Sequence, residues 1–189
     1  MGERADPCGP PFSLYGFGSG CYDVQVSIFD KNDALHLRNL VFGVEDGIVS
    51  TVGLLSGIAI ADVPPATILL TGVVLIFVEA VSMAAGSFLS EASVDDLSGQ
   101  EKTSAQSTVA GMIMFTSYFA AGFVPLLPYM FLEVQQAFPV SIIAALGALF
   151  VLGYWSGKGS RTPGKKAFRM MLVGGAAILV GVLAGSVLV

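Results

Sequence analysis

Three carboxylates stand inside long apolar stretches of the sequence, where ionised side chains are rare. Glu45 and Asp46 lie in the first stretch, and Glu79 lies in the second. A carboxylate in the centre of a membrane-spanning helix costs about 2.5–3.5 kcal/mol, so each one marks a candidate functional site. No Lys or Arg occurs deep within these stretches to neutralise them. The partners that remain are protons, each other or a metal cation.

Met83 follows Glu79 by four residues, which places both side chains on one face of a helix. A carboxylate oxygen and a thioether sulfur suit a late first-row divalent metal ion better than Mg²⁺ or Ca²⁺. Met83 is equally consistent with ordinary packing. The only histidine, His36, falls at the membrane edge, and no Ser–His or Cys–His pair lies within the apolar stretches. The sequence therefore predicts metal binding and no enzyme.

Two pairs of glycines with four-residue spacing lie near the carboxylates of the first stretch. They are Gly43 with Gly47, and Gly53 with Gly57. This spacing allows two helices to approach closely. The partner helix either belongs to the same chain or lies across a dimer seam, where two sets of ligands would meet on a two-fold axis. The first pair also brackets the carboxylates, so backbone could approach a bound ion there.

The apolar stretches that carry these residues dominate the composition. Of 189 residues, 54% are hydrophobic and 12% are charged, and the mean hydropathy is +0.77. A soluble domain carries about 25% charged residues, so most of this surface must face lipid. The net charge of −5 argues against a nucleic-acid partner, and two cysteines are too few for a disulfide scaffold.

Five segments are long enough to cross a membrane as helices, which takes about 20 residues each. Helices are required because lipid offers no partner to backbone groups, and the segments lack the alternation of barrel strands. The segments cover residues 39–61, 63–89, 107–132, 137–156 and 167–189. We therefore predict an all-α polytopic membrane protein, with a polar tail over 1–38 and a five-helix transmembrane domain over 39–189.

All nine Lys and Arg residues fall on one side of this five-span arrangement. They are Arg4, Lys31, Arg38, Lys102, Lys158, Arg161, Lys165, Lys166 and Arg169. The positive-inside rule then places the N-terminus in the cytosol and the C-terminus on the other side. The tail lacks the features of a signal peptide. Its Cys8 and Cys21 are expected to be reduced in the cytosol, with a structural disulfide as the alternative.

Prolines mark the far end of the third segment. Pro125 and Pro128 are expected to bend this helix and to free carbonyl groups for another partner. Tyr129 and Glu133 follow, near the non-cytosolic surface. They form either an exit vestibule or, for Glu133, a simply solvated carboxylate.

Three motifs carry a resemblance to a known family. The stretches LRNLVFGVEDGIVSTVGLLSG (37–57), EAVSMAAGSFLSEAS (79–93) and GFVPLLPY (122–129) resemble the vacuolar iron transporter family. The resemblance covers residue 37 to the C-terminus. It implies a dimeric five-helix transporter that exchanges cytosolic Fe²⁺, and often Mn²⁺, for protons. The family's first-helix aspartate matches Asp46 before Gly47, and its second-helix glutamate and methionine match Glu79 and Met83.

The sequence departs from the plant-type members of that family in one interval. Those members carry a long cytosolic hairpin, rich in Glu and Met, between their second and third helices. Here residues 90–106 are too few for it. Their acidic residues form either a solvated loop or a residual metal-capture site; these are Glu91, Asp95, Asp96 and Glu101. The first 36 residues have no counterpart in the family.

These observations together predict a homodimeric integral membrane transporter that moves Fe²⁺ or Mn²⁺ out of the cytosol. Asp46, Glu79 and Met83 are the primary metal residues, and Glu45 is secondary. A proton gradient would drive the exchange, with no cofactor. The alternatives are an uncoupled channel or sensor of the same architecture, and an accessory membrane subunit whose carboxylates pair with a partner's cations. The short second connection favours a prokaryotic cell membrane over a vacuolar one.

Overall fold

The computed structural model describes residues 31–61, 63–98, 104–158 and 162–188, which form five α-helices. The helices are α1 (Lys31–Ile60), α2 (Pro65–Ser98), α3 (Ser104–Phe131), α4 (Val134–Ser156) and α5 (Pro163–Leu188). Each is long and apolar enough to cross a membrane. The predicted all-α fold with five transmembrane helices is therefore confirmed. The predictions for Cys8, Cys21 and Glu101 lie outside the described residues.

Three helix ends at the same end of the bundle extend beyond the prediction. Helix α1 begins at Lys31, so the last eight residues of the predicted tail are helical. Helix α2 continues to Ser98 and α3 begins at Ser104, so the predicted connection over 90–106 is wrong for most of its length. The length of an apolar run indicates how much of a helix lies inside lipid. The helix itself can extend beyond the lipid, because its backbone hydrogen bonds are formed within the helix.

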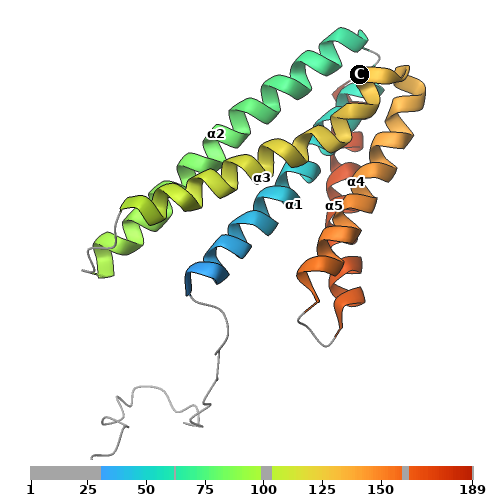
Figure 1. Cartoon of the computed structure of the whole chain (residues 1–189). Helices are drawn as coiled ribbons and strands as arrows, with labels where there is room; N and C mark the ends of the chain where they lie inside the picture. The colour runs from blue at the N-terminus through green and yellow to red at the C-terminus, as the bar shows by residue number, and fades with distance from the viewer. Residues whose placement is uncertain (1–30, 62, 99–103, 159–161, 189) are drawn as a thin grey trace, which may run out of the picture.

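Helix α1 is the centre of the bundle. It contacts each of the other four helices, while α2 packs mainly on α3, and α5 packs on α4 and α1. Figure 1 shows α2 and α3 running together on one side of α1, with the α4–α5 hairpin on the other. Residues of α1 can therefore face either pair of helices.

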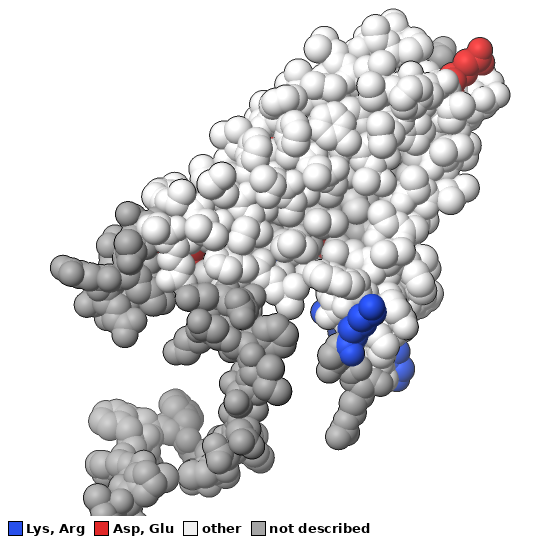
Figure 2. Space-filling view, viewed as in Figure 1, with Lys and Arg blue, Asp and Glu red and all other residues white. Residues whose placement is uncertain are grey.

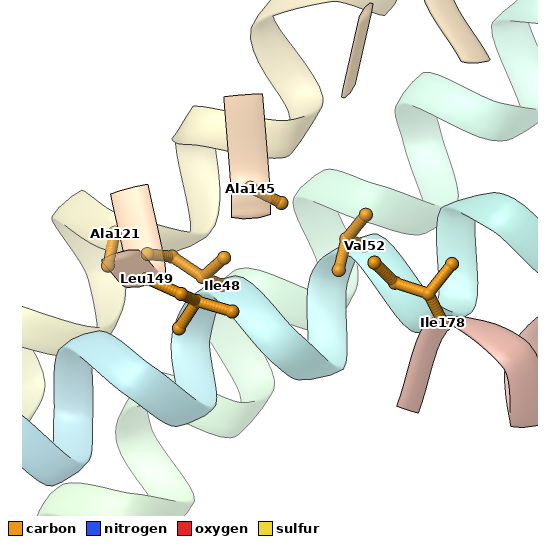
Figure 3. Close-up of a cluster of buried hydrophobic side chains, with 6 residues drawn as sticks. All are labelled: Ile48, Val52, Ala121, Ala145, Leu149 and Ile178. Atoms are coloured by element: carbon orange, nitrogen blue, oxygen red, sulfur yellow. The ribbon is translucent and has the colours of Figure 1, made fainter. Parts of the chain in front are cut away.

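A cluster of small and branched apolar residues joins α1 to α3, α4 and α5. Its members are Ile48, Val52, Ala121, Ala145, Leu149 and Ile178 (Figure 3). Lipid tails are as apolar as these side chains, so close packing rather than the hydrophobic effect holds such helices together. The cluster fixes the rotation of α1 about its axis, which in turn determines the direction of its carboxylates.

The first glycine pair of α1 lies against α3. A Cβ atom on Gly47 would approach the carbonyl oxygen of Tyr118 to 2.6 Å, and one on Gly43 would collide with Ser117 Oγ. The absence of a side chain at both positions brings the two backbones together. This contact places Tyr118 directly beside the segment of α1 that carries the carboxylates.

The second glycine pair lies against α5. A Cβ atom on Gly57 would approach the carbonyl oxygen of Gly181 to 2.7 Å, and the nearest atom to one on Gly53 is the Ala177 carbonyl oxygen at 3.5 Å. Both predicted pairs therefore make close helix contacts within one chain. The homodimer stays a prediction.

The charged residues gather at the two ends of the bundle, and the surface between them is almost uncharged (Figure 2). The end formed by the start of α1, the end of α4 and the start of α5 is called the basic end below. Its exposed cations are Arg38, Lys158, Lys165, Lys166 and Arg169. Glu133 is exposed between α3 and α4 at the opposite end. The cytosolic position of the basic end stays a prediction.

Candidate functional site

Asp46 and Glu79 occupy matching positions on α1 and α2, near the middle of each helix. Asp46 lies 12 residues beyond Ala34, where the first apolar span begins, and Glu79 lies 15 residues before Val94, where the second ends. At 1.5 Å per residue these positions are about 18 and 22 Å along the helices from those residues. The two carboxylates are close enough for their charges to repel each other. Both side chains are half-buried.

Tyr118 of α3 completes this group. Its side chain is fully buried. Its hydroxyl donates a hydrogen bond to Glu79 Oε2 and shares a second one with Ser50 Oγ of α1 at 2.5 Å. Tyr118 thus ties α1, α2 and α3 together at the level of the carboxylates. A hydroxyl fixed in this way also sets the orientation of the Glu79 carboxylate.

The sequence interpretation missed Tyr118 and Ser50. Tyrosine is common in apolar helices, and no spacing in the third span singled it out. The one available signal was that a buried tyrosine hydroxyl normally needs a hydrogen-bond partner. Nothing in the sequence could identify that partner.

Glu79 opens onto a hollow of about 540 Å³ between α1, α2 and α5. Apart from Glu79 and Ser50, its walls are apolar or glycine. The lining residues are Ser50, Gly53, Leu54, Gly57, Ile58, Ala61, Val63, Leu75, Glu79, Gly181, Ala184 and Gly185. We call it the glycine-lined hollow. Among the residues that the structure describes, Glu79 is the only charged one on these walls.

Met83 opens onto a different hollow, of about 380 Å³, nearer the basic end. Its walls also carry Met114 of α3, Asn39 of α1 and Glu91 of α2. Asn39 is buried and donates hydrogen bonds to Ser87 Oγ at 3.1 Å and to the Ala110 carbonyl oxygen at 3.5 Å. We call this space the methionine hollow. Although Met83 and Glu79 share α2, they line two successive hollows rather than one.

Glu45 faces away from Asp46. It lines a third hollow together with Arg38 of the same helix and Lys166 of α5. The positive charge of Lys166 acts on the Glu45 carboxylate, with a smaller effect than the negative charge of Asp46. The sequence did not indicate that a cation would lie in the same hollow as Glu45. The start of α5 folds back against α1 and supplies a cation that is distant in the sequence.

The residues predicted for an exit vestibule have different surroundings. Tyr129 is buried in an apolar cluster with Leu55, Ile76 and Leu126, and its hydroxyl has no hydrogen-bond partner among the described residues. Glu133 is exposed. The carbonyl oxygen of Pro125 accepts a hydrogen bond from Ser141 Oγ of α4 at 2.7 Å. These residues do not form a shared site with one another.

The described residues of one chain contain no group of three His, Cys, Asp or Glu side chains able to hold a metal ion. What they provide is a pair of repelling carboxylates with two hydroxyl groups beside them. Such a pair binds a proton or a hard divalent cation in preference to remaining empty and charged. The arrangement suits exchange of ions better than permanent retention of one.

Comparison with known proteins gives two matches. The sequence pattern of the VIT family matches residues 37–109 and 95–186. Vacuolar iron transporter homolog 4 of Arabidopsis thaliana is 30% identical over 167 residues, which is 80% of this chain and 83% of that protein. The matched ranges span the positions of Asp46, Glu79, Met83 and Tyr118.

Proposed function

The chain belongs to the VIT family, and on this premise we propose that it transports a divalent metal ion, Fe²⁺ or Mn²⁺, out of the cytosol. The observation that carries the proposal is the pair formed by Asp46 and Glu79. The two carboxylates lie near the middle of two helices that are long and apolar enough to span a membrane, and their charges repel each other. A divalent cation removes that repulsion and makes the pair neutral. The metal is the cargo rather than a resident cofactor.

We further propose that protons exchange with the metal at this pair. When the ion leaves, two carboxylates in a poorly solvated site are unfavourable unless they take up protons. The metal-loaded and protonated forms therefore alternate. This alternation couples metal movement in one direction to proton movement in the other.

The methionine hollow is proposed as the entrance. It lies between the basic end, which the distribution of Lys and Arg assigns to the cytosol, and the carboxylate pair. Glu91 offers an oxygen ligand there, and the sulfur atoms of Met83 and Met114 offer soft ones. Thioether sulfur suits Fe²⁺ better than Mn²⁺, so this passage would favour iron.

We propose that the transporter is a homodimer closed over the glycine-lined hollow. In a single chain this hollow leaves Glu79 at the edge of an apolar space between α1, α2 and α5. A carboxylate that faces hydrocarbon is unfavourable. A second copy related by two-fold symmetry would cover the hollow and bring a second carboxylate pair beside the first, completing a metal ligand shell.

The central test is metal uptake by proteoliposomes that contain the purified chain. We expect Fe²⁺ or Mn²⁺ uptake that rises when a pH gradient is imposed in the antiport direction and falls when the gradient is collapsed. Metal flux that does not change with the pH gradient would favour an uncoupled channel. Absence of flux together with a stoichiometric co-purifying protein would favour an accessory subunit.

The dimer has a separate test. After Cys8 and Cys21 are replaced by serine, Ala184→Cys should form a disulfide cross-link between two copies, because Ala184 lines the glycine-lined hollow. Val151→Cys is the control, since Val151 is 65% exposed on α4, outside the residues that line this hollow. A fully active monomer in vesicles would contradict the dimer.

A further inference from the structure

We propose that the basic end holds one anionic phospholipid in the hollow between α1, α4 and α5. This inference concerns a different hollow from the proposed metal entrance, although Arg38 and Phe42 line both. The hollow has a volume of about 470 Å³. Its lining residues are Ala34, Leu37, Arg38, Val41, Phe42, Glu45, Ser156 and Lys166. We call it the lipid hollow.

Two cations from different helices define the headgroup position. Arg38 lies four residues into the first apolar span, and Lys166 lies three residues into the fifth. Both are therefore at the level where phosphate groups of a bilayer lie. Lys166 Nζ donates a hydrogen bond to the Ser156 carbonyl oxygen at 3.1 Å, which holds its charge beside the hollow. Basic hollows between transmembrane helices are suited to anionic headgroups.

The remaining walls suit an acyl chain. Leu37 and Phe42 are 38% and 50% exposed, and Val41 lies between them on the same side of α1. Leu37 lies at the level of Arg38, and Val41 and Phe42 lie three and four residues farther along α1 toward the membrane interior. A free phosphate ion gains nothing from such a surface, whereas a phospholipid fills it. The combination of two cations with an apolar continuation therefore identifies a lipid.

The negative charge of Glu45 repels an anionic headgroup. Its removal therefore gives a test in which lipid binding should increase rather than decrease. It lines the same hollow seven residues beyond Arg38, about 10 Å farther along α1. Its carboxylate interacts with the charge of Lys166. The lipid hollow thus has two positive charges at the headgroup level and one negative charge deeper, and removal of the negative charge should strengthen anion binding.

The test uses the full chain in nanodiscs that contain phosphatidylglycerol and phosphatidylcholine, with bound lipid counted by native mass spectrometry. We expect retention of about one phosphatidylglycerol per chain. Arg38→Gln and Lys166→Gln should each lower the preference for the anionic lipid by about fivefold. Glu45→Gln should raise it. Lys165→Gln is the matched control, because Lys165 is exposed next to Lys166 but does not line the hollow.

Three results would overturn the proposal. The first is an equal loss in Lys165→Gln, which would indicate a general attraction of the basic end. The second is displacement of the lipid by millimolar inorganic phosphate, which would indicate a site for the free ion. The third is a cross-link between two copies from Phe42→Cys, which would place a second chain over the hollow. Unchanged melting temperatures in phosphatidylcholine alone would confirm that the glutamine variants are folded.

Discussion

Glu45 and Asp46 are neighbours in the sequence, yet they belong to two different regions of the molecule. Asp46 lies beside Glu79 and increases the negative charge there. Glu45 lies beside Arg38 and Lys166 in the lipid hollow. Successive residues of a helix point about 100° apart. Because α1 is the centre of the bundle, that rotation places the two carboxylates against different neighbours.

The difference shows what makes an intramembrane carboxylate suitable for transport. Two neighbouring negative charges repel each other, so binding of a cation or a proton to such a pair is strongly favourable. Glu45 has the positive charge of Lys166 near it as well as the negative charge of Asp46, so it gains less from a metal ion than a carboxylate with only negative neighbours. The cost of burial identified both residues in the sequence, but it does not distinguish these two cases. What distinguishes them is the helix that packs against each residue.

The largest expected effect is the loss of the pair itself. Asp46→Asn and Glu79→Gln should each nearly abolish metal uptake, because one remaining carboxylate cannot neutralise a divalent cation. Proton-driven exchange should disappear with it. The measurement is the initial rate of uptake in proteoliposomes, normalised to protein inserted in the membrane.

Glu133→Gln provides the control for these substitutions. It removes the same charge from an exposed position at the opposite end of the bundle, and it should leave the rate unchanged. Near wild-type flux in Asp46→Asn or Glu79→Gln would exclude that residue from the pathway and end the comparison with Glu45.

A smaller but still large effect is expected at Tyr118. Tyr118→Phe keeps the ring and removes the hydroxyl that donates to Glu79 and bonds to Ser50. Hydrogen bonds to charged groups contribute about 1.5–3 kcal/mol, so we expect uptake to fall by roughly tenfold or more. Loss of the hydroxyl leaves the Glu79 carboxylate free to rotate away from Asp46.

Tyr129→Phe is the matched control for Tyr118. Tyr129 is also a buried tyrosine of α3, but its hydroxyl has no hydrogen-bond partner among the described residues. Its substitution should leave uptake unchanged. Equal losses in the two variants would indicate that the ring packing matters and the hydroxyl does not.

Tyr118 also illustrates what the sequence could and could not predict. The five spans were predictable because lipid requires long apolar helices. Asp46 and Glu79 were predictable because burial makes each carboxylate expensive by itself. The hydroxyl that positions Glu79 was not, since its two partners lie 39 and 68 residues away along the chain. The position of Lys166 in the same hollow as Glu45 was missed for the same reason, because it depends on how α5 packs against α1.

A moderate effect on selectivity is expected at Met83. Met83→Leu keeps volume and apolarity while it removes the sulfur atom from the methionine hollow. If sulfur assists entry, uptake of Fe²⁺ should fall more than uptake of Mn²⁺. Met112→Leu is the control, because Met112 is 63% exposed on the outer side of α3. An unchanged ratio of the two rates would make Met83 a packing residue.

The smallest effect is expected at Glu45, and it tests the comparison most directly. Glu45→Gln removes a carboxylate that the charge of Lys166 stabilises in part, against the larger opposing effects of burial and of Asp46. Partly exposed ion pairs contribute about 0.2–1 kcal/mol, so uptake should fall by less than about fivefold. The double variant Glu45→Gln/Lys166→Gln should be no worse than either single variant, because the two changes remove the same interaction. A loss as deep as that of Asp46→Asn would show that Glu45 takes part in the metal pathway, and that helix rotation does not separate the two carboxylates in function.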